Sequence, residues 1–441
     1  MTSAAGRAMA RMEGSARFLA LIKLANVALV LIWGFAVTYV FVRVLPLREF
    51  QSFLLLVAFG NFTISAEFGL TSIIYARLRR HWLGVGEVGM GPFRLEEMGV
   101  LFLFLGLLIL CALTILIIAL VAGAVHTAMP LLFLLFFLSA CVNLPALLAK
   151  RALAAVDGNF LWEALDCARR VVTILLLLAI LFGLDPRLSV ALQLAVSMVV
   201  IGYAIALVHR RLGMSRHHWL AFRIGGAHVR SYYLRDIGSS ALLTISDILA
   251  YNAPYFTIAL ATHDARPMLL FDFFFKMSRA LSMAVRATVE AALPRITRAF
   301  HAGDAARLRQ LLLRALGVAF FFALVASAAL LLVGQWLFAK LFAHRAAIGM
   351  IDLLLVDCAL LALALICVSV YVQGALGRFA HLVKRSLPFL AGSLLSVPLA
   401  ILLLPDRFDD AFLAFYTATL LVAGALQALS LHRLLRGDAA Q

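Results

Sequence analysis

The stretch MLLFDFFFKMSRALSMAVRATVEAAL, residues 268–293, places charged side chains at helical spacing inside a hydrophobic segment. Its ionisable residues follow one another at intervals of four, three, seven and four positions. Residues three, four and seven apart stack on one side of an α-helix, so one face of this helix is charged and the other is apolar. The charged face consists of Asp272, Lys276, Arg279, Arg286 and Glu290.

Such a helix is stable in a membrane only if its charged face avoids lipid. A charge near the bilayer centre costs roughly 2.5–3.5 kcal/mol on insertion scales, whereas a strongly apolar residue contributes about 0.5 kcal/mol. Five such charges therefore outweigh about ten apolar residues. We expect the charged face to meet water or partner charges inside a helix bundle, as the wall of a polar pathway.

The rest of the chain has the composition of a membrane protein. Hydrophobic residues make up 64% of the 441 residues, and only 14% are charged. Apolar runs of about twenty residues recur, each able to cross about 30 Å of hydrocarbon, and no alternating pattern of a β-barrel is visible. The sequence thus predicts an all-α polytopic membrane protein with about 12 transmembrane helices. The predicted spans are 18–42, 50–76, 98–122, 128–149, 168–184, 188–208, 237–261, 268–293, 312–339, 348–372, 384–404 and 409–431.

The basic residues predict the orientation. Of the 38 Lys and Arg residues, 27 lie in the tails and loops that share a side with the N-terminus, seven lie in the opposite loops and four lie within spans. By the positive-inside rule, both termini are cytoplasmic, as expected for a multi-pass protein of the bacterial inner membrane. The first apolar run is too long for the core of a cleavable signal peptide and lacks a convincing cleavage site, so we expect it to remain as a span.

The net charge of +16 is accordingly a topology signal, and nucleic acid is not an expected partner. Five cysteines without a CxxC pair, and eleven histidines without HExxH, give no disulfide framework or zinc site. No nucleotide-binding motif, nucleophile or pair of catalytic carboxylates is visible. We therefore expect a protein that is not an enzyme and uses no cofactor or metal.

The longest inner loop divides the predicted spans into two sets of six. We expect an N-terminal six-helix lobe over residues 1–208, a basic cytoplasmic interlobe loop over 209–236, and a C-terminal six-helix lobe over 237–441. Trp219, Phe222, Tyr232 and Tyr233 interleave with arginines in the loop, a composition that suits a segment at the membrane surface. Two halves of equal span number and orientation are typical of parallel repeats in transporters.

Two further stretches carry recognisable motifs: VRVLPLREFQSFLLLVAFGNFTISAEFGLTSIIYARLRR (42–80), with a Phe-Gly-Leu element, and LPRITRAFHAGDAARLRQLLLRAL (293–316). They resemble the second span, and the signature after the eighth span, of the polysaccharide flippases of the multidrug/oligosaccharidyl-lipid/polysaccharide (MOP) exporter superfamily. Pro46 stands where the family usually has Gly. Residues 147–176 and 372–386 are looser matches to their inner loops. Within the superfamily, the twelve-span O-antigen or exopolysaccharide flippases fit best.

This resemblance implies two lobes that form a V-shaped central cavity lined by spans 1, 2, 7 and 8. The charged residues within spans fall largely on those helices. Arg and Lys suit a phosphate-bearing head, and amides suit sugar hydroxyls. The candidate substrate-binding residues are Arg279, Lys276, Arg286, Lys23, Asn26 and Asn61, and the candidates for ion coupling or ion pairing are Asp272, Asp247, Glu67, Asp357 and Glu290.

Structural roles remain open for these candidates. Lys23, Glu67, Arg286 and Glu290 lie within one or two turns of the inner surface, so snorkelling or interfacial pairing is an alternative. A structural ion pair with Asp272 or Asp247 is the alternative for the deeper Lys276 and Arg279. Asp357 suits either ion coupling or a structural pair, and Asn26 and Asn61 suit helix packing.

We therefore expect a transporter that moves polyprenyl-pyrophosphate-linked oligosaccharide repeat units to the outer leaflet by alternating access with a cationic cavity. Its expected partners are the lipid-linked oligosaccharide, membrane lipids, and a polysaccharide polymerase with its assembly proteins, with coupling to H⁺ or Na⁺ left open. One alternative is an H⁺- or Na⁺-coupled exporter of drugs or metabolites, whose cavity should instead be net acidic. The other is a non-transporting scaffold of a polysaccharide assembly complex.

Overall fold

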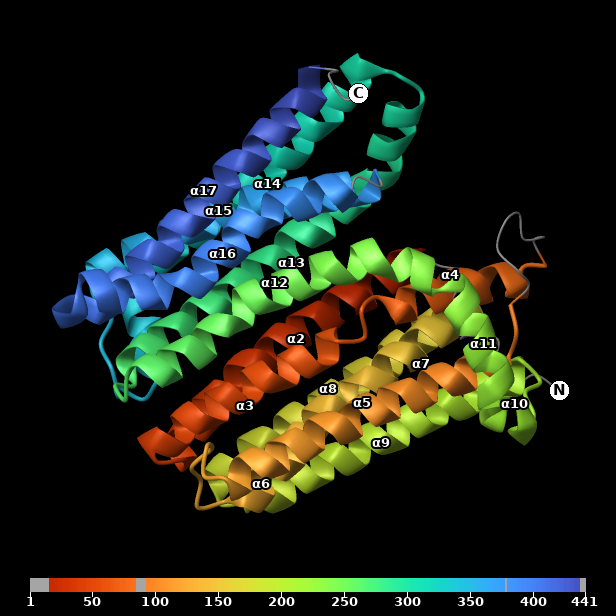
Figure 1. The fold of residues 1–441 in the computed structure, drawn as a ribbon, viewed down its shortest axis with the longest axis horizontal. Coiled ribbons are helices and arrows are strands. Elements are labelled where there is room, and N and C mark those ends of the chain that lie inside the picture. The colour runs from red at the N-terminus through yellow and green to blue at the C-terminus, as the bar shows by residue number, and fades with distance from the viewer. Residues whose placement is uncertain (1–15, 85–92, 377–378, 437–441) are drawn as a thin grey trace. The chain divides into compact units, whose positions relative to one another are not determined.

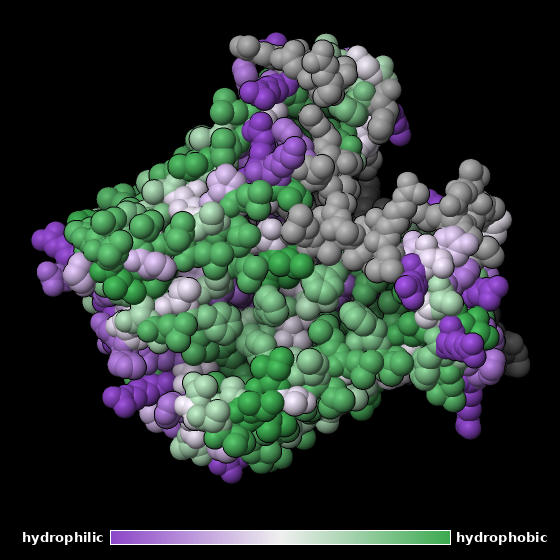
Figure 2. Space-filling view, viewed as in Figure 1, coloured by the Kyte–Doolittle hydropathy of each residue, from purple (hydrophilic) through white to green (hydrophobic). Residues whose placement is uncertain are grey.

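The computed structural model describes residues 16–84, 93–376 and 379–436, and its regular elements there are helices (Figure 1). Eight of them are long and apolar enough to cross a membrane. Each of the twelve predicted spans falls on a helix or on a pair of consecutive helices, which confirms the prediction of an all-α polytopic membrane protein. Figure 2 shows apolar side chains over the flanks of the helices, with hydrophilic side chains gathered mainly toward their ends.

The chain forms two compact units. Unit 1 contains Met1–Val44 and Leu56–Ala241, and unit 2 contains Leu45–Leu55 and Leu242–Gln441. The boundary therefore passes through α3 (Leu47–Ser65) and α12 (Leu234–Ala261).

Unit 1 is a bundle in which α8 packs on α2 and α9, and α9 packs on α6 and α7. The basic segment after α9 forms two short helices that pack on the start of α5. The helices of this unit other than α3 are α2 (Ala16–Val44), α4 (Leu70–Trp82), α5 (Glu96–Val121), α6 (Pro130–Cys141), α7 (Asn143–Ala155), α8 (Asn159–Ala179), the 3₁₀ turn η1 (Ile180–Phe182), α9 (Pro186–Arg211), α10 (Arg216–Leu220) and α11 (Phe222–Tyr232).

Unit 2 packs α15 against α13, α14 and α17, and α16 against α17. Gly303, at φ 69°, makes the turn between α13 and α14, and the Asp304 carboxylate accepts the Arg307 N–H at 2.9 Å as the cap of α14. Besides α12, the elements are α13 (Arg266–His301), α14 (Ala305–Leu341), α15 (Met350–Ala375), α16 (Phe379–Leu403), the 3₁₀ turn η2 (Pro405–Arg407) and α17 (Phe408–Arg436).

The second predicted span is not one helix. It divides into α3 and α4 where Phe68 and Gly69 adopt left-handed φ values of 51° and 79°. The Glu67 carboxylate accepts the backbone N–H of Thr71 at 2.9 Å, which satisfies one of the orphan donors at the start of α4. A Phe at positive φ is strained, so tertiary packing must stabilise this break.

The fifth predicted span begins too late in the sequence. Expected at 168, it starts at Asn159, and residues 159–167 are helical rather than part of an inner loop. The amphipathic first half of α8 explains the error, because its charges lower the local hydropathy although several of them are buried. Arg169 and Arg170, at the start of the predicted span 168–184 and counted with the basic residues on the side of the N-terminus, lie in the middle of this helix.

The segment predicted as the interlobe loop, residues 209–236, contains the end of α9 and the short helices α10 and α11. An added Cβ at Gly225 of α11 would lie 2.5 Å from the carbonyl oxygen of Glu96, and one at Gly99 of α5 would lie 2.6 Å from that of Trp219. The two glycines thus allow α10 and α11 to approach α5 backbone to backbone. Beneath this contact, the fully buried Glu97 forms an ion pair with Arg77 and accepts the Tyr233 hydroxyl at 2.6 Å.

Candidate functional site

In unit 2, α13 carries a buried ion pair within the predicted span 268–293. Asp272 is 1% exposed, and one of its carboxylate oxygens accepts a hydrogen bond from the Lys276 ammonium, one helical turn away. The other accepts the Tyr255 hydroxyl of α12 at 2.9 Å. Both carboxylate oxygens are therefore occupied, which offsets the cost of burying the charge.

Aromatic rings enclose this pair. Tyr255 meets Phe271 edge to face at 4.9 Å between ring centroids, and Phe275 at 5.9 Å. Phe271 in turn meets Tyr416 of α17 at 5.3 Å. The apolar shell lowers the local dielectric, so loss of either partner would leave an uncompensated charge.

The remaining basic residues of the charged face have a different environment. Arg279 and Arg286 are exposed, and each guanidinium lies near an aromatic ring: Phe275 at 5.9 Å for Arg279 and Tyr371 at 5.6 Å for Arg286. The side chain of Glu290 lies outside the described residues. The charged face is thus divided into a buried pair, Asp272 and Lys276, and an exposed basic part, Arg279 and Arg286.

Two further acids of unit 2 were predicted as coupling candidates. Asp247 of α12 is half-buried, and among the described residues its carboxylate makes no hydrogen bond or ion pair. Of the two acids considered as partners for Lys276, Asp272 is the one that forms the ion pair. Asp357 of α15 is 7% exposed and accepts the Ser327 hydroxyl of α14 at 2.8 Å. Its other carboxylate oxygen, Oδ1, is buried without a described hydrogen-bond partner.

Unit 1 contains a second buried polar cluster, which joins α2 to α8. The Asn26 amide donates to Glu163 at 2.7 Å and to Asp166 at 2.9 Å. All three residues are at most 5% exposed. Asn26 was predicted to contact substrate, whereas its amide nitrogen is engaged in holding two carboxylates together.

Basic residues surround the two carboxylates of this cluster. Asp166 forms ion pairs with Arg169 at 2.6 Å and Arg170 at 2.9 Å on the same helix. Glu163 pairs with Lys150 of α7 at 3.1 Å. We call the set Asn26, Lys150, Glu163, Asp166, Arg169 and Arg170 the α8 cluster.

Most of the α8 cluster was missed from the sequence. Glu163, Asp166 and Arg170 are three and four positions apart, the same helical spacing that drew attention to α13. That signal was present, but the assignment of residues 150–167 to a loop concealed it. Only the packing of α2 on α8 could show that Asn26 lies between the two carboxylates.

The other candidates of unit 1 are not gathered at one place by described contacts. Lys23 is exposed on α2, and Glu67 caps α4. Asn61 of α3 is half-buried, and its Nδ2 atom is buried without a described hydrogen-bond partner. These three residues remain candidates on the strength of the sequence.

No family model matches the chain, and no curated protein matches it. Solved structures do. The Vibrio cholerae MATE transporter VcmN, in its bent form, superposes with a TM-score of 0.63 at 17% identity over 98% of both chains. An inward-facing multidrug resistance MATE family transporter of the MOP superfamily gives 0.66 at 12% identity over 96% of this chain and 99% of its own.

A flippase shares the same architecture. The lipid II flippase MurJ, in an inward closed conformation, superposes with a TM-score of 0.59 at 13% identity over 95% of this chain and 88% of its own. Because these identities are low, the likeness concerns the fold and not the cargo. The chain therefore has the all-helical membrane fold shared by MATE transporters and the lipid II flippase of the MOP superfamily.

Proposed function

We propose that this protein is a membrane transporter that translocates polyprenyl-pyrophosphate-linked oligosaccharides to the outer leaflet for surface polysaccharide biosynthesis. The exposed basic part of the α13 charged face, Arg279 and Arg286, is the observation that carries the proposal. Guanidinium groups on a membrane-spanning helix suit a cargo whose head bears phosphate, because they donate bidentate hydrogen bonds to its oxygens. The shared fold of MATE transporters and a lipid II flippase supports a transport function.

The buried pair has a supporting role in this proposal. Asp272, itself bonded by the Tyr255 hydroxyl, holds the Lys276 ammonium one turn before Arg279. With Lys276 neutralised by Asp272, the basic excess of the charged face lies at Arg279 and Arg286. A phosphate-bearing head would then meet two guanidinium groups seven residues apart, about 10 Å along the helix axis.

A second candidate function is an H⁺- or Na⁺-coupled exporter of organic cations. The half-buried Asp247 and the buried Asp357, whose Oδ1 atom has no hydrogen-bond partner among the described residues, favour it, because acids of this kind take up protons or cations. The MATE likeness supports this candidate as well as the first. The charge of the exposed part of the α13 face favours the first candidate function over the second, since Arg279 and Arg286 would repel an organic cation.

Reconstitution of the full chain in liposomes tests the choice of cargo. A fluorescent polyprenyl-diphosphate oligosaccharide placed in one leaflet is monitored by a membrane-impermeant quencher, and efflux of a fluorescent organic cation is measured in parallel under H⁺ and Na⁺ gradients. We expect protein-dependent translocation of the lipid-linked glycan and no efflux of the cation. Efflux of the cation without translocation of the glycan would replace the first proposal by the second. If the folded protein shows neither activity, the scaffold alternative is supported.

A further inference from the structure

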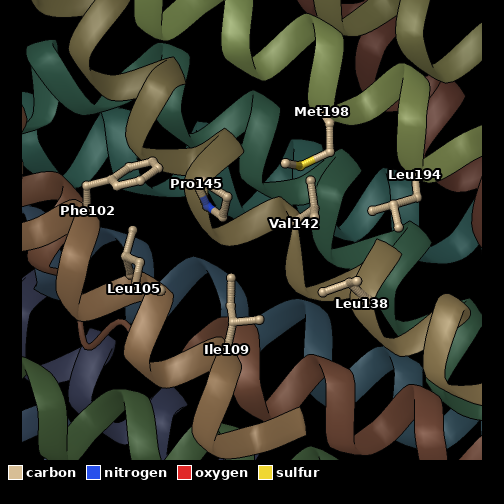
Figure 3. A pocket seen from close by; sticks show the side chains of 9 residues that line it. Phe102, Leu105, Ile109, Leu138, Val142, Pro145, Leu194 and Met198 are labelled. Carbon is tan, nitrogen blue, oxygen red and sulfur yellow. The ribbon is translucent and has the colours of Figure 1, made fainter.

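An apolar cavity of about 270 Å³ lies in unit 1 between α5 and α9. Figure 3 shows Phe102, Leu105 and Ile109 of α5 on one side and Leu194 and Met198 of α9 on the other, with Val142, at the break between α6 and α7, between them. The lining contains no charged or hydrogen-bonding side chain. An occupant of this cavity must therefore be a hydrocarbon.

The depth of the cavity supports the same conclusion. Ile109 and Met198 lie near the middle of their helices, each of which has 26 residues. At 1.5 Å per residue, both positions are about 20 Å from either helix end, close to the bilayer midplane. Phe102 and Met198 are 42% and 55% exposed, so the cavity opens toward the lipid rather than into the bundle.

The same faces of α5 and α9 continue toward the end of the bundle where α10 packs. Met98, Ile205 and Val208 follow at helical spacing and meet the Trp219 ring of α10. Trp219 lies edge to face on Phe102 at 5.9 Å and donates its indole N–H to His209 at 3.0 Å. A Trp with one apolar and one hydrogen-bonded edge is typical of the membrane interface.

Beyond Trp219 the surface is basic. Arg210 and Arg216 are exposed on the two sides of the turn at Gly213, and His217 is exposed beside them. Arg210 is twelve residues from Met198, about 18 Å along α9, which is close to the half-thickness of the hydrocarbon core, about 15 Å. This span matches one leaflet phospholipid, whereas a long isoprenoid tail would extend far beyond it.

We propose that unit 1 binds one anionic phospholipid, with its headgroup on Arg210 and Arg216 and the end of one acyl chain in the cavity between α5 and α9. The charges of the site complement a phosphate-bearing headgroup, and its apolar walls complement the chain. The site is independent of the transport proposal, because it lies on other helices than Arg279 and Arg286 and needs no cargo.

The acyl-chain part of the site is tested by filling the cavity. A Cβ built on Gly106, which lines the cavity, meets no atom within 4 Å, so Gly106→Phe places a ring in the cavity without a clash at its base. Gly317→Phe in α14 is the matched control, since Gly317 is also exposed, helical and open. We expect the purified full chain in detergent to retain phosphatidylglycerol, which native mass spectrometry detects. The affinity should fall roughly 10-fold or more in Gly106→Phe and stay unchanged in Gly317→Phe, because only in Gly106→Phe does the acyl chain lose several buried methylene groups.

The headgroup part is tested by lipid choice. We expect wild-type protein to prefer phosphatidylglycerol to phosphatidylcholine, and Arg210→Gln with Arg216→Gln to reduce that preference roughly 10-fold, as expected for two basic residues at a membrane surface. Equal retention of the two lipids by wild type would overturn the proposal. So would unchanged retention in Gly106→Phe or an equal loss in Gly317→Phe. If Gly106→Phe does not fold, Gly106→Leu with an unchanged melting temperature is used instead, and unchanged retention of phosphatidylglycerol in that variant would equally overturn the proposal.

Discussion

The α8 cluster of unit 1 and the charged face of α13 in unit 2 use similar residues in different ways. In the α8 cluster, Glu163 and Asp166 are each bonded by several partners from α2, α7 and α8. On α13, Asp272 and Lys276 are the buried pair among the described side chains, and Arg279 and Arg286 are exposed. The comparison teaches that a charge enclosed by partners fixes helix packing, whereas an exposed guanidinium keeps part of its surface in contact with the surroundings of the helix.

The largest effect on folding is expected at the centre of the α8 cluster. Asp166→Asn leaves Arg169, 6% exposed, and Arg170 without their carboxylate partner. Removing one partner of a buried ion pair costs about 3–5 kcal/mol, so the melting temperature of the purified protein should fall sharply. Lys23→Gln, at an exposed position of α2, is the control and should leave the melting temperature unchanged. An unchanged melting temperature in Asp166→Asn would show that the cluster does not hold α2 on α8.

Arg279→Ala should show the opposite pattern. Because Arg279 is exposed, the substitution should leave abundance and melting temperature near wild type. Loss of one contact to an anionic head is expected to cost about 2–5 kcal/mol, which reduces translocation of the lipid-linked glycan about 30-fold or more. Arg279→Lys should restore part of the rate, since a point charge does not reproduce the bidentate fork. Full translocation by Arg279→Ala would remove this residue from the mechanism.

A double-mutant cycle on Asp272 and Lys276 distinguishes a role in stability from a role in cargo binding. Lys276→Met alone should destabilise the protein by about 3 kcal/mol, because it leaves the Asp272 charge buried with only Tyr255 as a partner. Adding Asp272→Asn should restore most of that stability. Translocation should stay below wild type in the double variant if Lys276 contributes to cargo binding. Equal stabilities of the single and double variants would mean that the two side chains are not energetically coupled.

A smaller effect is expected at Asp357. Ser327→Ala removes the hydrogen bond to the Asp357 carboxylate at 2.8 Å and should lower stability by about 1 kcal/mol. Ser282→Ala, which removes a hydroxyl from α13 beside Cys367, about three turns along α15 from Asp357, is the comparison. If Asp357 binds a coupling cation, Na⁺ should raise the melting temperature of wild-type protein and raise that of Ser327→Ala less. If neither Na⁺ nor the substitution changes the melting temperature, Asp357 neither binds a coupling cation nor stabilises the fold through Ser327.

The smallest effect is expected at Asp157, between α7 and α8 of unit 1 and outside the predicted spans. Hydrogen bonds from Arg79 and Trp82 lower the pKa of Asp157 below its ordinary value. Because the folded-state pKa is below that of the unfolded chain, the stabilisation is present above about pH 4 and is lost as the pH falls through the folded-state pKa. Asp157→Asn should therefore lower the melting temperature slightly at pH 7, and the difference should vanish at the lowest pH that the protein tolerates. If the difference in melting temperature between wild type and Asp157→Asn persists unchanged at low pH, it does not arise from the charge of Asp157.

The sequence determined the helical membrane architecture and the charged face of α13. Both are local properties, because a run of apolar residues and a spacing of three or four positions are contained in one segment. It also identified the Glu67–Leu70 stretch as distinctive, but not that the helix breaks there, since a left-handed Phe68 depends on packing.

Only the tertiary structure decided which charges are enclosed and which are exposed. Asn26 is 137 residues from Glu163, and Tyr233 is 136 residues from Glu97, yet both pairs are hydrogen-bonded. The partners of a buried charge come from whichever helices pack beside it, and helical periodicity gives the direction of a side chain without naming the neighbour it meets. For that reason Asn26 was expected at substrate and is bonded to two carboxylates, while the carboxylates themselves were hidden in a segment whose low hydropathy resembled a loop.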